Sequence, residues 1–324
     1  MKFARRQFLH LAAGVAALPV VSRMAHAQAY PTRPITMIVP IAAGSSLDVV
    51  GRLLAERMGT ALGQPIVIEN VPGADGSIGV GRVARARPDG YTIEFGDLTM
   101  YVLNGAFYSL SYDLLGDLTP ISPVAWVPYV LYAKGSLPAK DLKELIAWLR
   151  ANPYKASAGV TAVSYRMLTA LFQQETGTRF TLVPYRGFAT QFQDLAAGRI
   201  DFFFDTATQL PFTRAGNIKA YAVTSDARLV QVPDIPTFSE MGLPSLSSSG
   251  WNALFAPKNV PQEIIGKLNA AAVEALADQQ VRSRLADLGF EVYPLERQTP
   301  EALNAMRKAE AEKWRPIIKE YRSI

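Results

Sequence analysis

The chain has 324 residues and a formal net charge of +5, from 33 Lys and Arg against 28 Asp and Glu, with two His and no Cys. The lack of Cys excludes disulfides, thiol nucleophiles and thiolate metal sites. Both histidines, His10 and His26, lie near the N-terminus, so the rest of the chain has no imidazole for a catalytic triad, a general base or a metal ligand.

Residues 1–27 have the features of an export signal. Lys2, Arg5 and Arg6 form a positive start, residues 9–21 are apolar and small, and residues 25–27 form an Ala-x-Ala cleavage site. The apolar run is shorter than the roughly 20 residues that span a bilayer. We therefore expect the signal to be cleaved and the mature chain to lie in the periplasm, without inserting into the membrane.

The route of export depends on two adjacent arginines. Arg5-Arg6 followed by Gln7-Phe8-Leu9 is typical of a twin-arginine signal, and an ordinary secretory signal with two neighbouring arginines is the alternative. Either route ends in the periplasm.

The predicted mature chain begins at Gln28 and is almost neutral. Residues 1–27 hold four of the 33 basic residues and none of the 28 acidic ones, so the mature net charge is +1. There is no basic tract of the kind that binds nucleic acid. A mature chain of about 297 residues is too long for one comfortable core, so we expect two domains.

Short apolar runs alternate with amphipathic ones from the start of the mature chain. The spacing predicts helices around residues 49–58 and at 78–86. Strands are predicted before, between and after them, at 35–39, 65–69 and 91–95. This order favours a parallel sheet with crossover helices.

A second block repeats the alternation, which predicts two lobes of similar architecture without a sequence repeat between them. The Pro- and Ser-rich segment 225–249 is expected to be a connector. The strands predicted in and after this block are 129–132, 181–183, 200–204, 219–223 and 251–255, and the helices are 142–152, 164–175, 191–197, 261–277 and most of 299–321.

The turn after the first predicted strand is the first candidate binding site. Its small residues let the backbone approach a ligand, and its serines can cap the helix that follows. A helix N-terminus offers free N–H groups and a positive dipole end, which suit an anion such as a carboxylate. A well-capped turn without a binding role is the alternative. The candidate residues are Ala42, Ala43, Gly44, Ser45, Ser46 and Asp48.

Two further turns also precede helices. One lacks both the dinucleotide-binding and the P-loop patterns, so it either lines a cleft or simply allows tight helix–strand packing. The other places hydroxyl groups at a helix N-terminus in the second block, opposite the first site. The candidates are Gly73, Ala74 and Gly76 in the former and Gly159, Thr161, Ala162, Ser164 and Tyr165 in the latter.

Two charged positions complete the candidate site. Arg186, followed by Gly187, could hold a carboxylate through two hydrogen bonds or be a solvated surface arginine. Asp205 and Thr206 end a very apolar strand, and ligands of open α/β sheets sit at the carboxyl ends of strands. Asp205 could instead cap the next helix.

Catalytic patterns are scarce. The sequence has no G-x-S-x-G nucleophile elbow, and its acidic residues are scattered rather than paired. We therefore predict a binding protein without cofactor or metal, and not an enzyme.

An ordered series of short motifs over the mature chain resembles the receptors of tripartite tricarboxylate transporters, also called the Bug family. Each motif is modest, and their order together with the export signal carries the resemblance. The motifs include Pro40…Ala43-Gly44…Asp48…Arg52, Asn70-x-Pro-Gly73-Ala-x-Gly76-x-x-Gly79, Pro88-Asp-Gly-Tyr-Thr92, Asp117-Leu-Thr-Pro-Ile121, Tyr185-Arg-Gly187, Leu195-Ala-Ala-Gly198, Val232-Pro-Asp-Ile-Pro-Thr237 and Leu254-Phe-Ala-Pro257.

The resemblance implies a type II periplasmic-binding-protein fold, in which two α/β lobes close on a ligand. It places strands that cross between the lobes near residues 127–133 and 250–257. The expected division is a first lobe of residues 28–127, a second lobe of 128–250, and a return segment of 251–324 that completes the first lobe.

The resemblance also implies what is bound and delivered. The ligand would be a small organic acid: a di- or tricarboxylate, an acidic amino acid or an aromatic acid. The turns at 42–46 and 159–164 would hold its carboxylate, and a two-subunit membrane permease would be the partner of a monomeric receptor. A receptor that presents the acid to a signalling protein, and an enzyme on the same scaffold, are the alternatives.

Two departures from the family pattern bear on the ligand. The family often has Gly-Gly where this chain has Gly44-Ser45, and a Gly-Ser-rich stretch ending in Ser-His where it has Ser164-Tyr165. Tyr165 favours a bulkier or aromatic acid.

Overall fold

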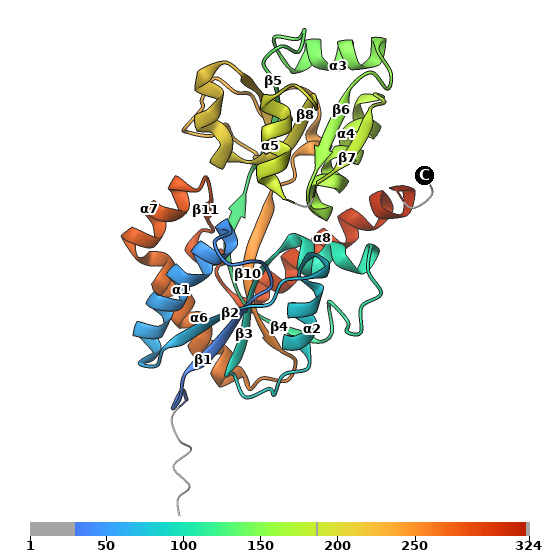
Figure 1. The fold of residues 1–324 in the computed structure, drawn as a ribbon. Coiled ribbons are helices and arrows are strands. Elements are labelled where there is room, and N and C mark those ends of the chain that lie inside the picture. The colour runs from blue at the N-terminus through green and yellow to red at the C-terminus, as the bar shows by residue number, and fades with distance from the viewer. Residues whose placement is uncertain (1–29, 186, 322–324) are drawn as a thin grey trace, which may run out of the picture.

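The computed structural model describes residues 30–185 and 187–321, so the predicted export signal and Arg186 lie outside the described residues. Two sheets, each flanked by helices, form two lobes that lie one above the other in Figure 1. The predicted two-lobe α/β fold is confirmed.

The first sheet has six strands in the order β11-β4-β10-β3-β1-β2. Strand β1 pairs in parallel with both β2 and β3, whereas β10 runs antiparallel between β3 and β4. Its strands are β1 (Ile35–Val39), β2 (Ile66–Asn70), β3 (Thr92–Asp97), β4 (Leu118–Val127), β10 (Gly250–Pro257) and β11 (Glu291–Val292).

The second sheet has five strands in the order β7-β6-β8-β5-β9. Strand β6 is parallel to β7 and β8, and β5 is antiparallel to β8 and β9. Its strands are β5 (Tyr129–Lys134), β6 (Ser157–Val160), β7 (Thr181–Pro184), β8 (Phe202–Thr206) and β9 (Ile218–Val223). The order matches β2-β1-β3-β10-β4 of the first sheet, so β3 and β8 occupy equivalent places.

Eight helices cover the described parts of the sheets. Helix α1 begins where the side chain of Ser45 accepts a hydrogen bond from the Asp48 N–H, and it ends at Gly63 in the left-handed conformation. The helices are α1 (Ser46–Leu62), α2 (Ser77–Ala84), α3 (Leu142–Ala151), α4 (Val163–Thr176), α5 (Phe188–Ala196), α6 (Gln262–Ala277), α7 (Gln279–Asp287) and α8 (Pro300–Tyr321). None of the described helices combines the length and the apolar character that crossing a bilayer requires.

Every strand and helix predicted from periodicity has an observed counterpart, with ends shifted by a few residues. Four elements escaped prediction. They are β4, β6, the short β11 and α7. Helix α7 buries only Val281 and Leu285, so its apolar stripe is too narrow to stand out.

The chain passes from the first sheet to the second at Val127-Pro128-Tyr129. The family resemblance placed a crossing strand near residues 127–133. The chain does cross between the sheets there, with β4 ending at Val127 and β5 starting at Tyr129. Pro128 lies between the two strands, belongs to neither of them, and has no N–H group to donate to a ladder. The strand expected at 250–257 is present, and all of its pairing is within the first sheet.

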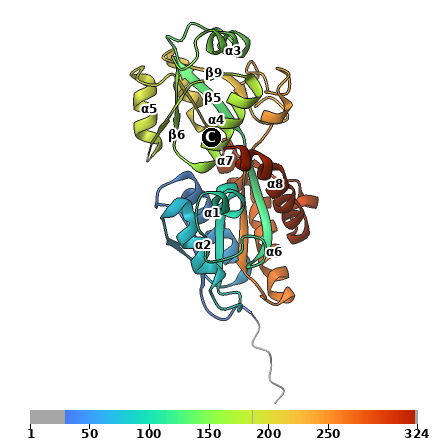
Figure 2. The same ribbon diagram turned by 90° about the vertical axis from the view of Figure 1, so that its right-hand side faces the viewer.

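Helix α8 lies across the seam between the lobes. It packs against β4 of the first sheet and contacts α4 of the second lobe. Figure 2 shows it at the level where the lobes meet. Its Trp314 is buried, and Lys313 donates from Nζ to the Ser247 carbonyl at 3.3 Å. The chain connects the lobes twice, between β4 and β5 and again where it returns at β10. The contacts of the C-terminal helix α8 are a further link between them.

Candidate functional site

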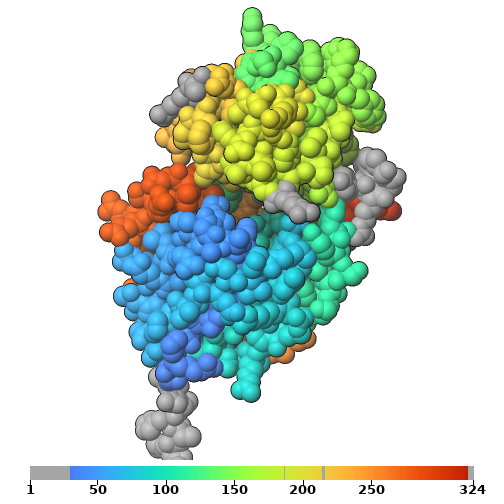
Figure 3. All heavy atoms as spheres, in the orientation of Figure 1, coloured from blue at the N-terminus to red at the C-terminus, as the bar shows by residue number. Residues whose placement is uncertain are grey.

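A cavity of about 730 Å³ lies between the two lobes, and both lobes contribute to its wall. In the space-filling view of Figure 3 the seam appears as a recess between the blue residues of the first lobe and the yellow residues of the second. Most of the residues singled out from the sequence line this one cavity. They are Ala42, Gly44, Ser45, Ser46, Gly73, Gly76, Thr161, Ala162, Ser164, Tyr165, Asp205 and Thr206.

The remaining candidates lie beside or below the wall. Ala43 and Ala74 belong to the turns without lining the cavity, and Gly187 precedes α5 next to the lining residue Phe188. Gly159 is buried within β6, where an added Cβ would lie 2.7 Å from Ile200. Its lack of a side chain thus serves packing beneath the turn.

Asp48 holds the first-lobe turn from below. Its Oδ2 accepts from the Gly44 N–H at 2.8 Å and from Arg52 Nε at 3.0 Å. Its Oδ1 accepts from Asn70 Nδ2 at 2.8 Å, and the same amide group donates to the Ile41 carbonyl at 3.1 Å. Gly44 has a φ of +84°, a conformation that glycine adopts at little cost. Residues 41–48 are therefore fixed in one shape.

The carboxyl of Asp48 stays ionised because of these bonds. Burial by itself would raise its pKa, but hydrogen bonds from Arg52, Gly44 and Asn70 outweigh burial and hold the pKa below its ordinary value. The negative charge faces away from the cavity, since Asp48 is only 2% exposed and does not line it.

The N-termini of α1 and α4 both point into the cavity. Ser46 and Leu47 of α1 and Ser164 and Tyr165 of α4 line it. The first N–H groups of a helix have no acceptor within the helix, and they lie at its positive dipole end. At α4 the cap residue Ala162 offers no side-chain oxygen to them. Two sets of N–H donors, one per lobe, are thus available to one anion.

An aspartate lies at the C-terminal end of β3 and another at the C-terminal end of β8, and both line this cavity. Asp205 of β8 is 6% exposed, and its Oδ1 accepts from the Thr206 N–H at 2.6 Å and from the Tyr165 hydroxyl at 3.3 Å. Burial raises its pKa to about 7, against the effect of these hydrogen bonds. Asp97 of β3 also lines the cavity, and burial raises its pKa to about 6.

Asp97 was missed because the predicted strand stopped at residue 95, two residues short of its observed end. The sequence did contain an indication, because Asp97 and Asp205 each come within two residues after a predicted strand. The equivalence of β3 and β8 becomes visible only in the sheet order.

Strand β10 supplies polar groups that no periodicity indicated. Trp251 and Asn252 line the cavity, and both are buried. Among the described residues, Trp251 Nε1 and Asn252 Oδ1 have no hydrogen-bond partner. A buried polar atom without a partner costs about 1–3 kcal/mol, and both atoms are shielded from solvent in this conformation.

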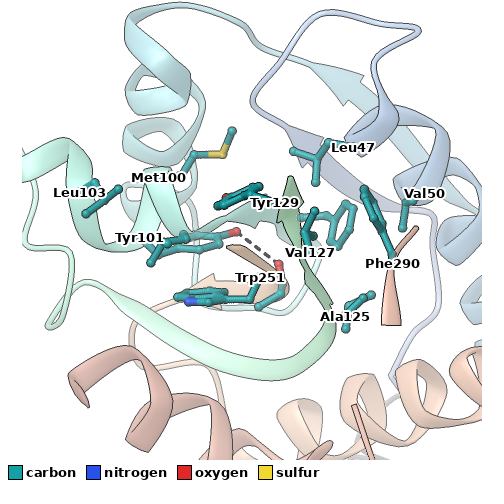
Figure 4. Packing of buried hydrophobic residues seen from close by; sticks show 14 of the residues in the cluster. Leu47, Val50, Met100, Tyr101, Leu103, Ala125, Val127, Tyr129, Trp251 and Phe290 are labelled. Atoms are coloured by element: carbon teal, nitrogen blue, oxygen red, sulfur yellow. Dashed lines mark hydrogen bonds between the residues drawn. The ribbon is translucent and has the colours of Figure 1, made fainter. Parts of the chain in front are cut away.

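Aromatic side chains form the floor and the inner wall. Trp251 and Tyr129 line the cavity, and Tyr101 packs behind them without lining it. Figure 4 shows the rings of Tyr101 and Trp251 stacked, with centroids 5.8 Å apart and planes at 10°. Tyr129 meets Tyr165 of the second lobe edge to face, with centroids 5.1 Å apart. Phe290 and Leu47 close the apolar side of the floor. The cavity wall thus combines aromatic and aliphatic side chains with polar groups.

This arrangement offers several kinds of polar group that can hold a small ligand. Within residues 30–185 and 187–321 no cluster of three or more His, Asp or Glu side chains is placed to hold a metal ion. The polar groups are backbone N–H donors, hydroxyls, the amides of Gln209 and Asn252, and carboxyls. They can orient a small ligand that has an anionic end.

Comparison with known proteins identifies relatives of the same architecture. The family model described as Tripartite tricarboxylate transporter family receptor matches residues 50–322. Protein BugT of Bordetella pertussis is 35% identical over 299 residues, which cover 91% of this chain and 91% of BugT.

Solved structures agree with this. MatC from Rhodopseudomonas palustris, determined with bound malate, is 34% identical with a TM-score of 0.79 and covers 89% of this chain and 100% of its own. A second R. palustris protein, determined with adipate, is 32% identical with a TM-score of 0.79. The match covers 90% of this chain and 97% of that protein.

Proposed function

Because the chain belongs to the tripartite tricarboxylate transporter receptor family, we propose that it is a periplasmic solute-binding protein that captures a small carboxylate by closure of its lobes. The observation that carries this proposal is the pair of helix N-termini, α1 and α4, that face one cavity from opposite lobes. The malate and adipate held by two relatives agree with a carboxylate ligand.

Capture would proceed through the turns at 42–46 and 159–164. Backbone N–H groups and the hydroxyls of Ser46, Thr161 and Ser164 would surround the carboxylate. Closing the lobes removes water from the cleft, and hydrogen bonds to a charged group are strongest where water is excluded. The family is one of receptors, and the acid would accordingly leave the cavity unchanged.

The remaining parts of the proposal concern delivery. The closed receptor would dock on a two-subunit membrane permease, after export directed by residues 1–27, with the twin-arginine route favoured. We propose residues 28–127 with 251–324 as one lobe and 128–250 as the other. The two sheets support this division, except that Gly250 is the first residue of β10 in the first sheet.

Substitution of Ser46 by Pro tests the site. Ser46 is the first residue of α1, where Pro is tolerated, and the preceding Ser45 has the extended ψ of 163° that Pro requires. The change deletes one N–H donor at the cavity and one hydroxyl, but keeps the helix. Gln279→Pro is the matched control, at the exposed first residue of α7 and after an extended residue.

The measurement is a thermal-shift screen against C4 to C8 diacids, citrate, acidic amino acids and benzoates, with sugars as controls. A ligand that binds only the folded protein raises its melting temperature. We expect an acid to do so with the wild-type protein and with Gln279→Pro, and the shift to vanish with Ser46→Pro. A shift with sugars alone, or an equal shift with Ser46→Pro, would contradict the proposal.

A further inference from the structure

The two places where the chain crosses between the sheets lie beside each other. Val127 ends β4 and is paired with Gly250, the first residue of β10, in the first sheet. Tyr129 follows Val127 by two residues and begins β5 of the second sheet. A change in the angle between the lobes must bend the backbone here, because hinges of this kind turn at a few residues between the rigid parts.

Tyr129 is fixed to the second lobe by its backbone. Its N–H donates to Thr224 Oγ1 at 2.9 Å, and its carbonyl accepts from the Thr224 N–H at 2.8 Å. Its ring meets that of Tyr165 edge to face, with centroids 5.1 Å apart. Burial raises the pKa of Tyr129, and a hydrogen bond with Ser164 opposes this rise. The side chain thus supports the start of α4, one of the turns proposed to hold the carboxylate.

The hydroxyl end of the same side chain rests on the first lobe. A Cβ added at Gly250 would lie 2.1 Å from Tyr129 Oη and 2.7 Å from its Cζ, whereas ordinary contacts begin at 3.4 Å. The backbone of Gly250 is not left-handed, so its conformation does not call for glycine. Gly250 instead leaves the space that the Tyr129 hydroxyl occupies.

A side chain that is fixed to one lobe and rests on the other limits how far the lobes can turn. Tyr129 lines the cavity, so it lies on the cleft side of the hinge, where closure brings groups together. It is only 8% exposed, and its contacts with Tyr165 restrain the ring. Further closure would press the hydroxyl onto the backbone of Gly250, and packed atoms resist such compression.

Building on the proposed function, we propose that Tyr129 is a positioning residue that sets the closed angle of the receptor. Its hydroxyl stops against Gly250, and at that angle Ser164 and the other residues at the start of α4 reach the carboxylate. Tyr129 therefore acts on binding through α4 and the lobe angle, and needs no bond of its own to the acid.

A methyl group added at the stop tests this inference. Gly250→Ala should hold the lobes further apart and weaken acid binding by at least about tenfold, because the apparent affinity follows the fraction of protein in the closed state. The double variant Gly250→Ala with Tyr129→Phe lacks the atom that overlaps most, so it should regain part of the affinity. Gly266→Ala is the matched control, at an exposed position of α6 with nothing within 4 Å of the added Cβ.

The distance between two spin labels measures the lobe angle. The chain has no Cys, so labels attach only at the introduced Glu56→Cys of α1 and Ala196→Cys of α5, both exposed. The probes are succinate, adipate, citrate and benzoate, and calorimetry gives their affinities. With acid, the label distance should be longer in Gly250→Ala than in the wild type and Gly266→Ala. A side chain that only stabilised the fold would change the melting temperature and leave this distance unaltered.

A second variant removes the stop and keeps the test open if Gly250→Ala does not fold. Tyr129→Leu loses the hydroxyl and the ring, so nothing of the side chain reaches Gly250. The lobes should then close further, and the label distance with acid should be shorter than in the wild type. Melting curves identify the variants that fold.

The outcomes separate the two proposals. A longer distance and weaker binding in Gly250→Ala, both partly reversed by Tyr129→Phe, support the inference, as does a shorter distance in Tyr129→Leu. Wild-type distances in the folded variants overturn it, even if their affinity falls, and the carboxylate receptor then stands. No binding of any probe by the wild-type protein overturns the proposed function and this inference together.

Discussion

Replacing Asp205 by Asn should stabilise the ligand-free protein at neutral and alkaline pH. Burial raises the pKa of Asp205 to about 7 from its ordinary 3.8, because the ionised form loses its hydration. The folded state therefore holds a proton that the unfolded state releases. Because the pKa is raised, the contribution of protonated Asp205 to the free energy of unfolding is fully present below pH 3.8. This contribution is lost as the pH rises through 7.

The magnitude follows from the shift. About three pKa units at 1.36 kcal/mol each correspond to a loss of up to about 4 kcal/mol between pH 4 and 8. The side chains that face Asp205 are the hydroxyls of Tyr165 and Thr206 and, at longer range, the rings of Tyr129 and Tyr132. An Asn at 205 keeps an oxygen for the Tyr165 and Thr206 donors, so the hydrogen bonds are largely retained.

Urea unfolding at several pH values between 4.5 and 8.5 measures the effect. The free energy of unfolding of the wild-type protein should fall with pH relative to that of Asp205→Asn. Asp287→Asn, which makes the same change at an exposed position of α7, should follow the wild-type curve. Two curves that stay parallel over this range would refute the reasoning, because they would mean that Asp205 ionises in the folded state as it does in water.

Two further substitutions probe how the cavity is built. Gly250→Ala should destabilise the protein by about 1–3 kcal/mol, because the new Cβ would overlap the Tyr129 hydroxyl and lie 2.7 Å from its Cζ. Chemical denaturation of Gly250→Ala, with and without Tyr129→Phe, measures this loss. An unchanged free energy of unfolding in Gly250→Ala would show that the Tyr129 side chain moves freely. Asp48→Ala should cost about 2–3 kcal/mol at pH 7, because it leaves donors of Gly44, Arg52 and Asn70 unmatched. The pKa of Asp48 is lower in the folded state than in the unfolded state. Its contribution to the free energy of unfolding is therefore present at pH values above its unfolded pKa and is lost as the pH falls. The gap between wild type and Asp48→Ala in urea unfolding should therefore narrow towards pH 3, and a constant gap would contradict this.

The sequence predicted those parts of the fold that depend on local periodicity. The apolar run at 35–39 and the stripe of Val50, Leu54 and Met58 gave β1 and α1 because each buries its apolar residues against one sheet. Strand β6 has the small residues Ser157, Ala158 and Gly159, which read as a turn. Only its place between β7 and β8 makes it a strand.

The candidate site was predictable where it sits in turns and not where it sits in strands. Gly44, Ser45 and Thr161 lie in loops before helices, and such loops carry a local signal. Asn252 and Trp251 become part of the cavity because β10 returns to the first sheet after the whole second sheet has been formed. Pairing over that sequence distance leaves no trace in nearby residues.

The position of β10 also bears on how the chain acquires its structure. All five strands of the second sheet come from one continuous stretch, β5 to β9, whereas the first sheet needs β10 between β3 and β4. Until residues 250–257 are made, the facing edges of β3 and β4 have no partner, and open strand edges invite aggregation. We expect the second lobe to fold first during synthesis. The lobe that starts the chain would be finished last, when its missing central strand arrives.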